Sequence, residues 1–126
     1  MSWTTREIVD QLAKVVEPSR VKIDADDLQF YGNDWSNIDK PNPLAIVFPE
    51  SIKEVQAIVD LANKFNFPLV PSGGRTGLSG GALAKDRELV VAFDRMNKIL
   101  EFNQADNLVT CQPGVVTGTL KDFAES

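Results

Sequence analysis

The feature that most constrains this 126-residue chain is a glycine-rich stretch between two apolar segments of strand length, residues 67–70 and 89–93. Five of the eleven residues from Pro71 to Gly81 are glycine, and none of the eleven is acidic. Glycine tolerates positive φ and has no Cβ, so a ligand can approach the main chain closely. Successive exposed N–H groups can then converge on an anion such as a phosphate. We interpret the stretch as a ligand-binding loop; the alternative is a mobile hairpin tip.

The spacing of the glycines excludes two common nucleotide-binding loops. The stretch lacks the G-x-x-x-x-G-K-[ST] pattern of a Walker phosphate loop. A Rossmann G-x-G-x-x-G motif opens a helix directly after a strand. Here the glycines are followed only by a short charged turn, residues 84–88, and by another strand. The sequence therefore predicts a long loop from strand to strand, without a helix dipole.

Four segments in this order resemble the FAD-binding domain of the FAD-linked oxidases, also called PCMH-type or vanillyl-alcohol-oxidase-like flavoproteins. They are residues 43–50, residues 54–59 leading into the glycine loop, residues 94–100, and the turn at 112–115. Within the family, the chain looks most like the D-lactate dehydrogenases, the FAD subunit of glycolate oxidase and the D-2-hydroxyglutarate dehydrogenases. The resemblance implies an oxidoreductase with FAD as its cofactor.

The resemblance also implies which residues bind the cofactor. The backbone of residues 72–76 and 80–81 would surround the FAD pyrophosphate, the Thr76 and Ser79 hydroxyls would bind phosphate or ribityl oxygens, and residues 113–114 would lie along the cofactor from the far side. The candidate cofactor-binding residues are Ser72, Gly73, Gly74, Arg75, Thr76, Gly77, Ser79, Gly80, Gly81, Pro113 and Gly114. No catalytic residue is assigned, and no metal ligand.

Arg75 is an informative departure from part of the family. Covalent-flavin members often carry a histidine after the paired glycines, where it is bonded to the isoalloxazine ring. This chain has Arg75 at that position and no histidine at all, so we expect FAD to be bound non-covalently. Arg75 itself could supply charge near the phosphates or pair with an acidic neighbour.

Local patterns predict an α+β fold that fits a PCMH-type domain. Residues 45–48, a helix from Ser51 to about Asn66, and residues 69–70 are interpreted as one β-α-β unit with a parallel strand pair, flanked by helices. Ser51 and Glu54 have capping-box spacing, as do Thr4 and Glu7, where Trp3 and Ile8 could form a hydrophobic staple. The stripe of Ile8, Leu12 and Val15 or Val16 is interpreted as facing the core, with partner docking as the alternative.

The second half of the chain is predicted to begin an antiparallel part of the domain. Strands are expected at residues 89–93, 99–102 and 108–111, the last two joined as a hairpin by the polar turn at 103–107. Thr117 is expected to cap a final helix. Residues 1–42 are interpreted as an N-terminal helix and a polar connector, and residues 43–126 as the N-terminal part of a truncated FAD-binding domain. An unfinished surface could then drive self-association.

Composition narrows the functional class further. The net charge of −5 argues against a nucleic-acid partner, which would need a basic stripe. No run approaches the ~20 apolar residues of a membrane span, and no signal segment is present, so we expect a cytoplasmic protein, with peripheral contact to the inner face of a membrane left open. The single cysteine, Cys111, excludes an intramolecular disulfide. The acidic residues Asp24, Asp26 and Asp27 are not interpreted as a metal site.

Three functional hypotheses remain from the sequence. The first is the FAD-binding part of a dehydrogenase that transfers a hydride from a 2-hydroxy acid to flavin N5; the fragment alone would be inactive. The second is a flavoprotein of the same fold with another substrate, such as a sugar or alcohol oxidase or a reductase of cell-wall precursors. The third is a non-enzymatic nucleotide-binding module. The sequence Pro-Ser-Gly-Gly-Arg-Thr at residues 71–76 favours the first hypothesis.

Overall fold

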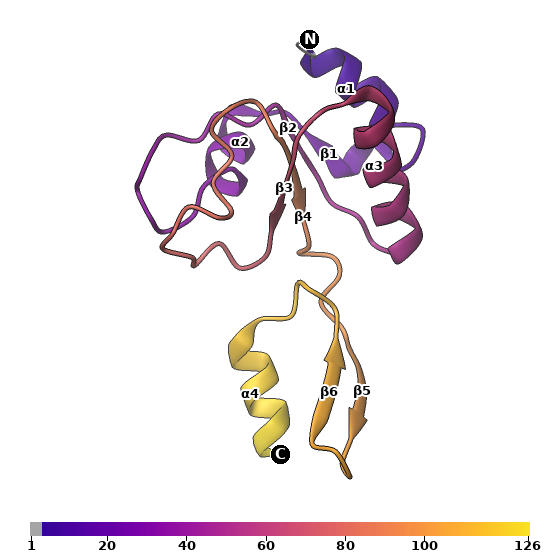
Figure 1. The fold of residues 1–126 in the computed structure, drawn as a ribbon, viewed down its shortest axis with the longest axis vertical. Coiled ribbons are helices and arrows are strands. Elements are labelled where there is room, and N and C mark those ends of the chain that lie inside the picture. Colours follow the sequence, from indigo (N-terminus) through magenta and orange to yellow (C-terminus); the bar gives the residue numbers. More distant parts are fainter. Residues whose placement is uncertain (1–3) are drawn as a thin grey trace.

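The computed structural model describes residues 4–126 and shows two lobes, an N-terminal sheet with helices on both faces and a smaller C-terminal lobe (Figure 1). The elements run in the order α1 (Thr5–Leu12), the 3-10 turn η1 (Pro18–Arg20), β1 (Val21–Lys22), α2 (Ala25–Tyr31), β2 (Ala45–Val47), α3 (Ile52–Phe65), β3 (Leu69–Ser72), β4 (Leu89–Ala92), β5 (Ile99–Asn103), β6 (Leu108–Cys111) and α4 (Thr117–Glu125). This is the α+β architecture that the sequence predicts.

The N-terminal sheet has the order β1-β2-β4-β3. Strands β2 and β3 each pair in parallel with β4, and β1 is antiparallel to β2. The predicted direct pairing of residues 45–48 with 69–70 is therefore wrong, because β4 lies between the two strands. All four residues of β4 are buried, which is what a central strand covered on both faces requires.

Alternation along the strands divides the core into two layers. One layer packs between the sheet and α1 with α3, and it includes Ile8, Leu12, Ala45, Val47, Ile58, Ala62, Leu89 and Val91. The other lies against the opposite face, where Leu28 and Tyr31 of α2 cover Ile46, Phe48, Val70, Val90 and Ala92. The stripe on α1 thus faces the core, as expected, and α2 closes the second face.

Both predicted helix starts in the N-terminal lobe are observed. Thr4 and Glu7 form a reciprocal capping box, while Trp3 of the expected staple lies outside the described residues. Ser51 caps α3 by accepting from the Glu54 N–H, and α3 ends at Asn66, which adopts a left-handed conformation. The Glu54 carboxylate reaches back one residue further than a capping box requires, to the N–H of Glu50.

The segment before residue 43 is more ordered than a polar connector. It contains α2, whose seven residues are too few to show a helical period in a sequence so rich in polar side chains. It also supplies β1, one of the two edge strands of the sheet. Three backbone hydrogen bonds join the segment to the chain that leads into β4: Ala84 N–H to Gly32 O, Asn42 N–H to Ala84 O, and Arg87 N–H to Asn42 O.

The C-terminal lobe is the predicted hairpin followed by a helix. Strands β5 and β6 pair antiparallel, and the ring of Phe102 meets that of Phe123 of α4 edge to face at 5.8 Å. The expected cap of α4 is wrong by one residue: the helix begins at Thr117, and Val116 occupies the capping position without a side-chain hydrogen bond.

Arg20 and Glu54 connect the turn before β1 to the first turn of α3. The guanidinium donates to both carboxylate oxygens, at 2.9 and 2.6 Å, and also to the carbonyl of Phe48 at 2.8 Å. The two side chains are only 11% and 19% exposed. The hydrogen bond from Arg20 lowers the pKa of Glu54, against burial, which raises it. The charged carboxylate is therefore favoured by folding.

We predict that Glu54→Gln lowers the free energy of unfolding at pH 7 by about 1–2 kcal/mol, the range for a partly buried, charge-assisted pair. Because the pKa of Glu54 is lowered, its contribution is fully present above the ordinary pKa of 4.5 and is lost as the pH falls below it through the lowered pKa of the folded state. Urea denaturation between pH 7 and pH 3 measures this. The difference between wild type and variant should shrink toward pH 3.

The matched control is Glu125→Gln, which removes the exposed Lys121–Glu125 pair of α4. It should leave stability within about 0.5 kcal/mol of wild type at every pH. An equal loss in both variants, or a difference that persists unchanged at pH 3, would contradict the assignment.

Candidate cofactor-binding site

The glycine loop leaves the carboxyl end of β3 and returns along the sheet to begin β4 without forming a helix (Figure 1). Two parallel neighbours can only be joined by such a long crossover. The start of the loop, Gly73 to Arg75, therefore lies beside Phe93 and Asp94, which follow the carboxyl end of β4. In open sheets with parallel strands, ligands bind outside the carboxyl ends of the strands.

Arg75 makes protein contacts on three sides. Its guanidinium pairs with both carboxylate oxygens of Asp94 at 3.1 and 3.0 Å and donates to the Ser72 hydroxyl at 3.2 Å. It also lies over the rings of Tyr31, at 4.7 Å, and Phe30, at 5.3 Å. Of the two roles left open by the sequence, pairing with an acidic neighbour is the one observed in the structure.

Ser72 is turned into the protein. It is fully buried, its hydroxyl accepts from Arg75, and its carbonyl accepts from the N–H of Phe93. The contribution of Ser72 to the site is therefore to hold the start of the loop against β4. Next to it, a Cβ on Gly73 would lie 3.7 Å from the carbonyl oxygen of Pro113, so the loop and the predicted turn at 113–114 are neighbours.

Gly114 is required by a close approach of backbones. Its N–H donates to the carbonyl of Met96 at 2.8 Å, and a Cβ here would lie 1.8 Å from the carbonyl oxygen of Phe93. Only glycine fits this position, which fixes the turn against the carboxyl end of β4. The sequence identified the turn by resemblance alone; the structure supplies the steric reason for its glycine.

The loop and the turn share a cavity of about 350 Å³. It is lined by Gly73, Gly74, Arg75, Asp94, Asn97, Gly114, Val116 and Thr119. Four of the predicted site residues are thus brought together from segments far apart in the chain. The cavity lies between the two lobes, where α4 follows the turn.

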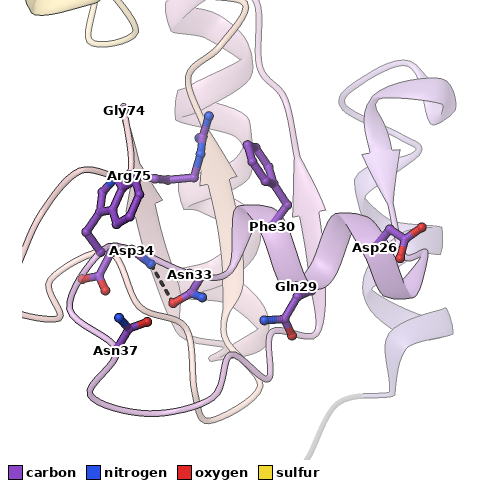
Figure 2. Close-up of a pocket in the computed structure, with 9 residues that line it drawn as sticks. Asp26, Gln29, Phe30, Asn33, Asp34, Asn37, Gly74 and Arg75 are labelled. Atoms are coloured by element: carbon purple, nitrogen blue, oxygen red, sulfur yellow. Dashed lines mark hydrogen bonds between the residues drawn. The ribbon is translucent and has the colours of Figure 1, made fainter.

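A second cavity of about 590 Å³ lies on the other side of Gly74 and Arg75, against α2 and the segment after it (Figure 2). Its lining is Asp26, Gln29, Phe30, Asn33, Asp34, Trp35, Asn37, Gly74 and Arg75. Sequence reasoning missed all of these except the last two. The exposed rings of Phe30 and Trp35 and the amides beside them give this cavity flat apolar walls with polar edges.

Asp34 lies in a segment that is hydrogen-bonded to the glycine loop. The residue is buried, and its Oδ1 accepts from the backbone N–H and the hydroxyl of Ser36, while Oδ2 is buried without a hydrogen-bond partner among the described residues. The side-chain hydrogen bond from Ser36, followed by the backbone N–H of Ser36, lowers the pKa of Asp34 against the effect of burial, and the nearby N–H of Gly80 lowers it further. The next residue, Trp35, donates its backbone N–H to the carbonyl of Gly77 at 3.0 Å.

The remaining predicted residues lie further along the loop, except Pro113, which lies in the turn after β6. Thr76, Gly77, Ser79, Gly81 and Pro113 are exposed and lie outside the two cavities. Gly80 has φ +80°, and a Cβ there would also meet the side chain of Ile38 at 3.1 Å. The far end of the loop therefore presents backbone and hydroxyl groups to solvent.

The site fits an anionic cofactor. A Cβ on Gly74 would meet nothing within 4 Å, so the backbone faces open space between the two cavities. In the smaller cavity, the carboxylate that lines the wall, Asp94, is neutralised by Arg75. Exposed glycine N–H groups with no uncompensated negative charge are what a diphosphate requires.

Comparison with known proteins identifies the family. Residues 43–126 match the model of a family described as FAD binding domain, and the chain belongs to this family. The predicted cofactor class is thereby confirmed. It is 56% identical over 122 residues to D-2-hydroxyglutarate dehydrogenase of Stutzerimonas stutzeri, covering 97% of this chain and 26% of the relative. It is 34% identical over 122 residues to D-lactate dehydrogenase of Anaerostipes hadrus, covering 96% and 26%.

Solved structures agree on the fold. An alkyldihydroxyacetonephosphate synthase matches with a TM-score of 0.82 at 26% identity, over 98% of this chain and 27% of the other. A p-cresol methylhydroxylase matches with a TM-score of 0.80 at 20% identity, over 95% and 24%. The predicted PCMH-type fold is confirmed. The chain spans about a quarter of the length of these relatives.

In residues 4–126, no helix is long and apolar enough to cross a membrane. In the same residues, His, Cys, Asp and Glu side chains form no group that could hold a metal ion, and Cys111 is a free, partly buried thiol.

Proposed function

We propose that this chain binds FAD non-covalently, with the diphosphate between the glycine loop and the turn at 113–114. The observation that carries the proposal is the cavity shared by Gly73, Gly74 and Gly114 at the carboxyl end of the parallel strands. At Gly74 the missing Cβ lets a ligand approach the backbone closely. At Gly114 it lets the turn pack against the backbone of Phe93. The family to which the chain belongs supports the identity of the cofactor.

Within this proposal, each part of the loop has its own role. Gly73 and Gly74 offer backbone N–H groups, Ser72 anchors the start of the loop, and Thr76, Ser79 and the segment Gly80–Gly81 bind the cofactor further along. The absence of histidine from the sequence, with Arg75 at the position after the paired glycines, supports a non-covalent complex. Residues 43–126 contact the cofactor, and residues 4–42 pack against this part of the chain and support it.

For the whole protein we propose oxidation of a 2-hydroxy acid of the D-lactate, glycolate or D-2-hydroxyglutarate type, in the cytoplasm. The names of the sequence relatives support this substrate class. When bound, FAD supplies the hydride acceptor. The residues of this chain bind and orient the cofactor, and none of them is proposed to move a proton or to hold the substrate.

The C-terminal lobe supports a second proposal, that the isolated chain self-associates. Leu100, Phe102, Leu108 and Val116 are each at least half exposed and lie within one small lobe. An apolar surface of this kind favours association. Sedimentation equilibrium tests this: we expect a mass above that of the 13.9 kDa monomer at high concentration, and a monomer throughout would contradict it.

We predict that FAD titrated into the chain binds saturably and that Gly74→Val abolishes the binding. A Cβ at residue 74 meets no atom within 4 Å apart from its chain neighbours, so the variant should fold with stability within about 0.5 kcal/mol of wild type while blocking the close approach of the cofactor. Quenching of flavin fluorescence measures affinity, and thermal unfolding measures stability.

The matched control is Gly118→Ala on α4, where a Cβ also meets nothing within 4 Å. It should bind FAD like wild type. Binding that survives Gly74→Val, or saturable binding equally lost in the Gly118→Ala control, would contradict the assigned site. No binding by wild type would contradict the proposal that this chain binds FAD.

A further inference from the structure

We propose that Arg75 and Asp94 form a clamp that sets the conformation of the glycine loop before the cofactor arrives, so that Arg75 is a positioning residue and not a phosphate ligand. The inference rests on the proposed function, since it concerns how the loop of that same site is held. We call the pair the Arg75–Asp94 clamp.

The clamp joins three elements of the N-terminal lobe. The guanidinium binds Asp94 after β4 with two hydrogen bonds and Ser72 at the end of β3 with one. It also stacks on Tyr31 of α2, whose ring meets that of Phe48 after β2 edge to face at 4.9 Å. Figure 2 shows Arg75 extending from the loop toward Phe30 of the same helix.

The backbone of the loop depends on these contacts. Arg75 has φ +61°, a left-handed conformation that a residue with a Cβ adopts at a cost of about 1 kcal/mol or more. Its neighbour Gly74 has no side chain and lies in open space, so it adds no packing. Such a conformation persists only when the surroundings hold it, and the side-chain contacts of Arg75 contribute to this here.

The positive charge of Arg75 is already paired with a carboxylate. Its side chain is only 14% exposed, and its fork is matched to the carboxylate of Asp94 with bidentate geometry. Binding a phosphate with the same guanidinium would require breaking this pair and leaving Asp94, which lines the smaller cavity, as an unpaired negative charge beside the phosphate. A preformed loop instead reduces the entropy lost when the cofactor binds.

Asp94→Asn separates the two roles, because it breaks the ion pair while leaving Arg75 charged. If Arg75 positions the loop, the variant binds FAD about three- to tenfold more weakly, since a partly exposed bidentate pair is lost. If Arg75 is a phosphate ligand, removing its competitor leaves the affinity unchanged or increases it. Arg75→Lys is the second variant: it keeps the charge, loses the fork, and should also weaken binding.

The second readout uses no cofactor. In the ¹⁵N-labelled chain without FAD, heteronuclear NOE values of the Gly73, Gly74 and Gly77 amides report the order of the loop on the picosecond to nanosecond timescale. The clamp predicts ordered values in wild type and lower values in both variants. The matched control is Arg95→Gln, which breaks the exposed Arg95–Glu50 pair next to Asp94 and should leave both the NOE values and FAD affinity at wild-type levels.

The loop NOE values and the FAD affinity together distinguish failure of the clamp from failure of the proposed function. Loop NOE values that are unchanged in folded Asp94→Asn and Arg75→Lys overturn the clamp, as does tighter FAD binding by Asp94→Asn. Lower loop NOE values with no FAD binding by wild type support the clamp and contradict the proposed function instead. Circular dichroism confirms folding; if Asp94→Asn does not fold, Arg75→Lys decides by its loop NOE values without FAD.

Discussion

The insertion of β4 between β2 and β3 is the constraint on which the site depends. Because β3 and β4 are parallel neighbours, the chain must cross the length of the sheet between them, and it does so as a glycine-rich loop instead of a helix. The same pairing places the start of that loop beside Asp94, directly after β4. The turn at Gly114 can then close on the backbone of Phe93. The cavity at this edge is a consequence of strand order.

A loop with so many glycines has little side-chain packing of its own, so its shape has to come from outside. From one side, Arg75 connects it to Asp94 and to the rings of α2. The segment around Asp34 is joined to the loop by a hydrogen bond from the Trp35 backbone N–H to the carbonyl of Gly77. The loop therefore combines exposed backbone, which a diphosphate needs, with fixed anchors at a few points. This is how a flexible composition gives a defined binding surface.

The parts of the fold that could be predicted are those encoded within a short stretch. The caps at Thr4 and Ser51, the end of α3 near Asn66, and the β5–β6 hairpin each follow from a few adjacent residues. The glycine loop was identified the same way. The position of β4 in the sheet was not predicted, although the uninterrupted apolar run Leu89–Ala92 is typical of a central strand.

The missed parts of the site depend on contacts between distant segments. Nothing in the spacing of Arg75 and Asp94 distinguishes their pairing from a free arginine facing a phosphate; only the β3–β4 register brings them together. The cavity beside α2 was missed because that short helix was interpreted as a connector. The Asp34-x-Ser36 pair, whose side chains bond locally, was the one available sign of a fixed structure there.

The central claim is that the glycine loop and the turn at Gly114 are two sides of one diphosphate site. The most direct measurement is the ¹H–¹⁵N correlation spectrum of the chain titrated with ADP, which carries the diphosphate without the flavin ring. We expect the amides of Gly73, Gly74 and Gly114 to shift together with one apparent Kd, while Gly118 does not shift. Shifts confined to one of the two segments, or spread evenly over the protein, would contradict it.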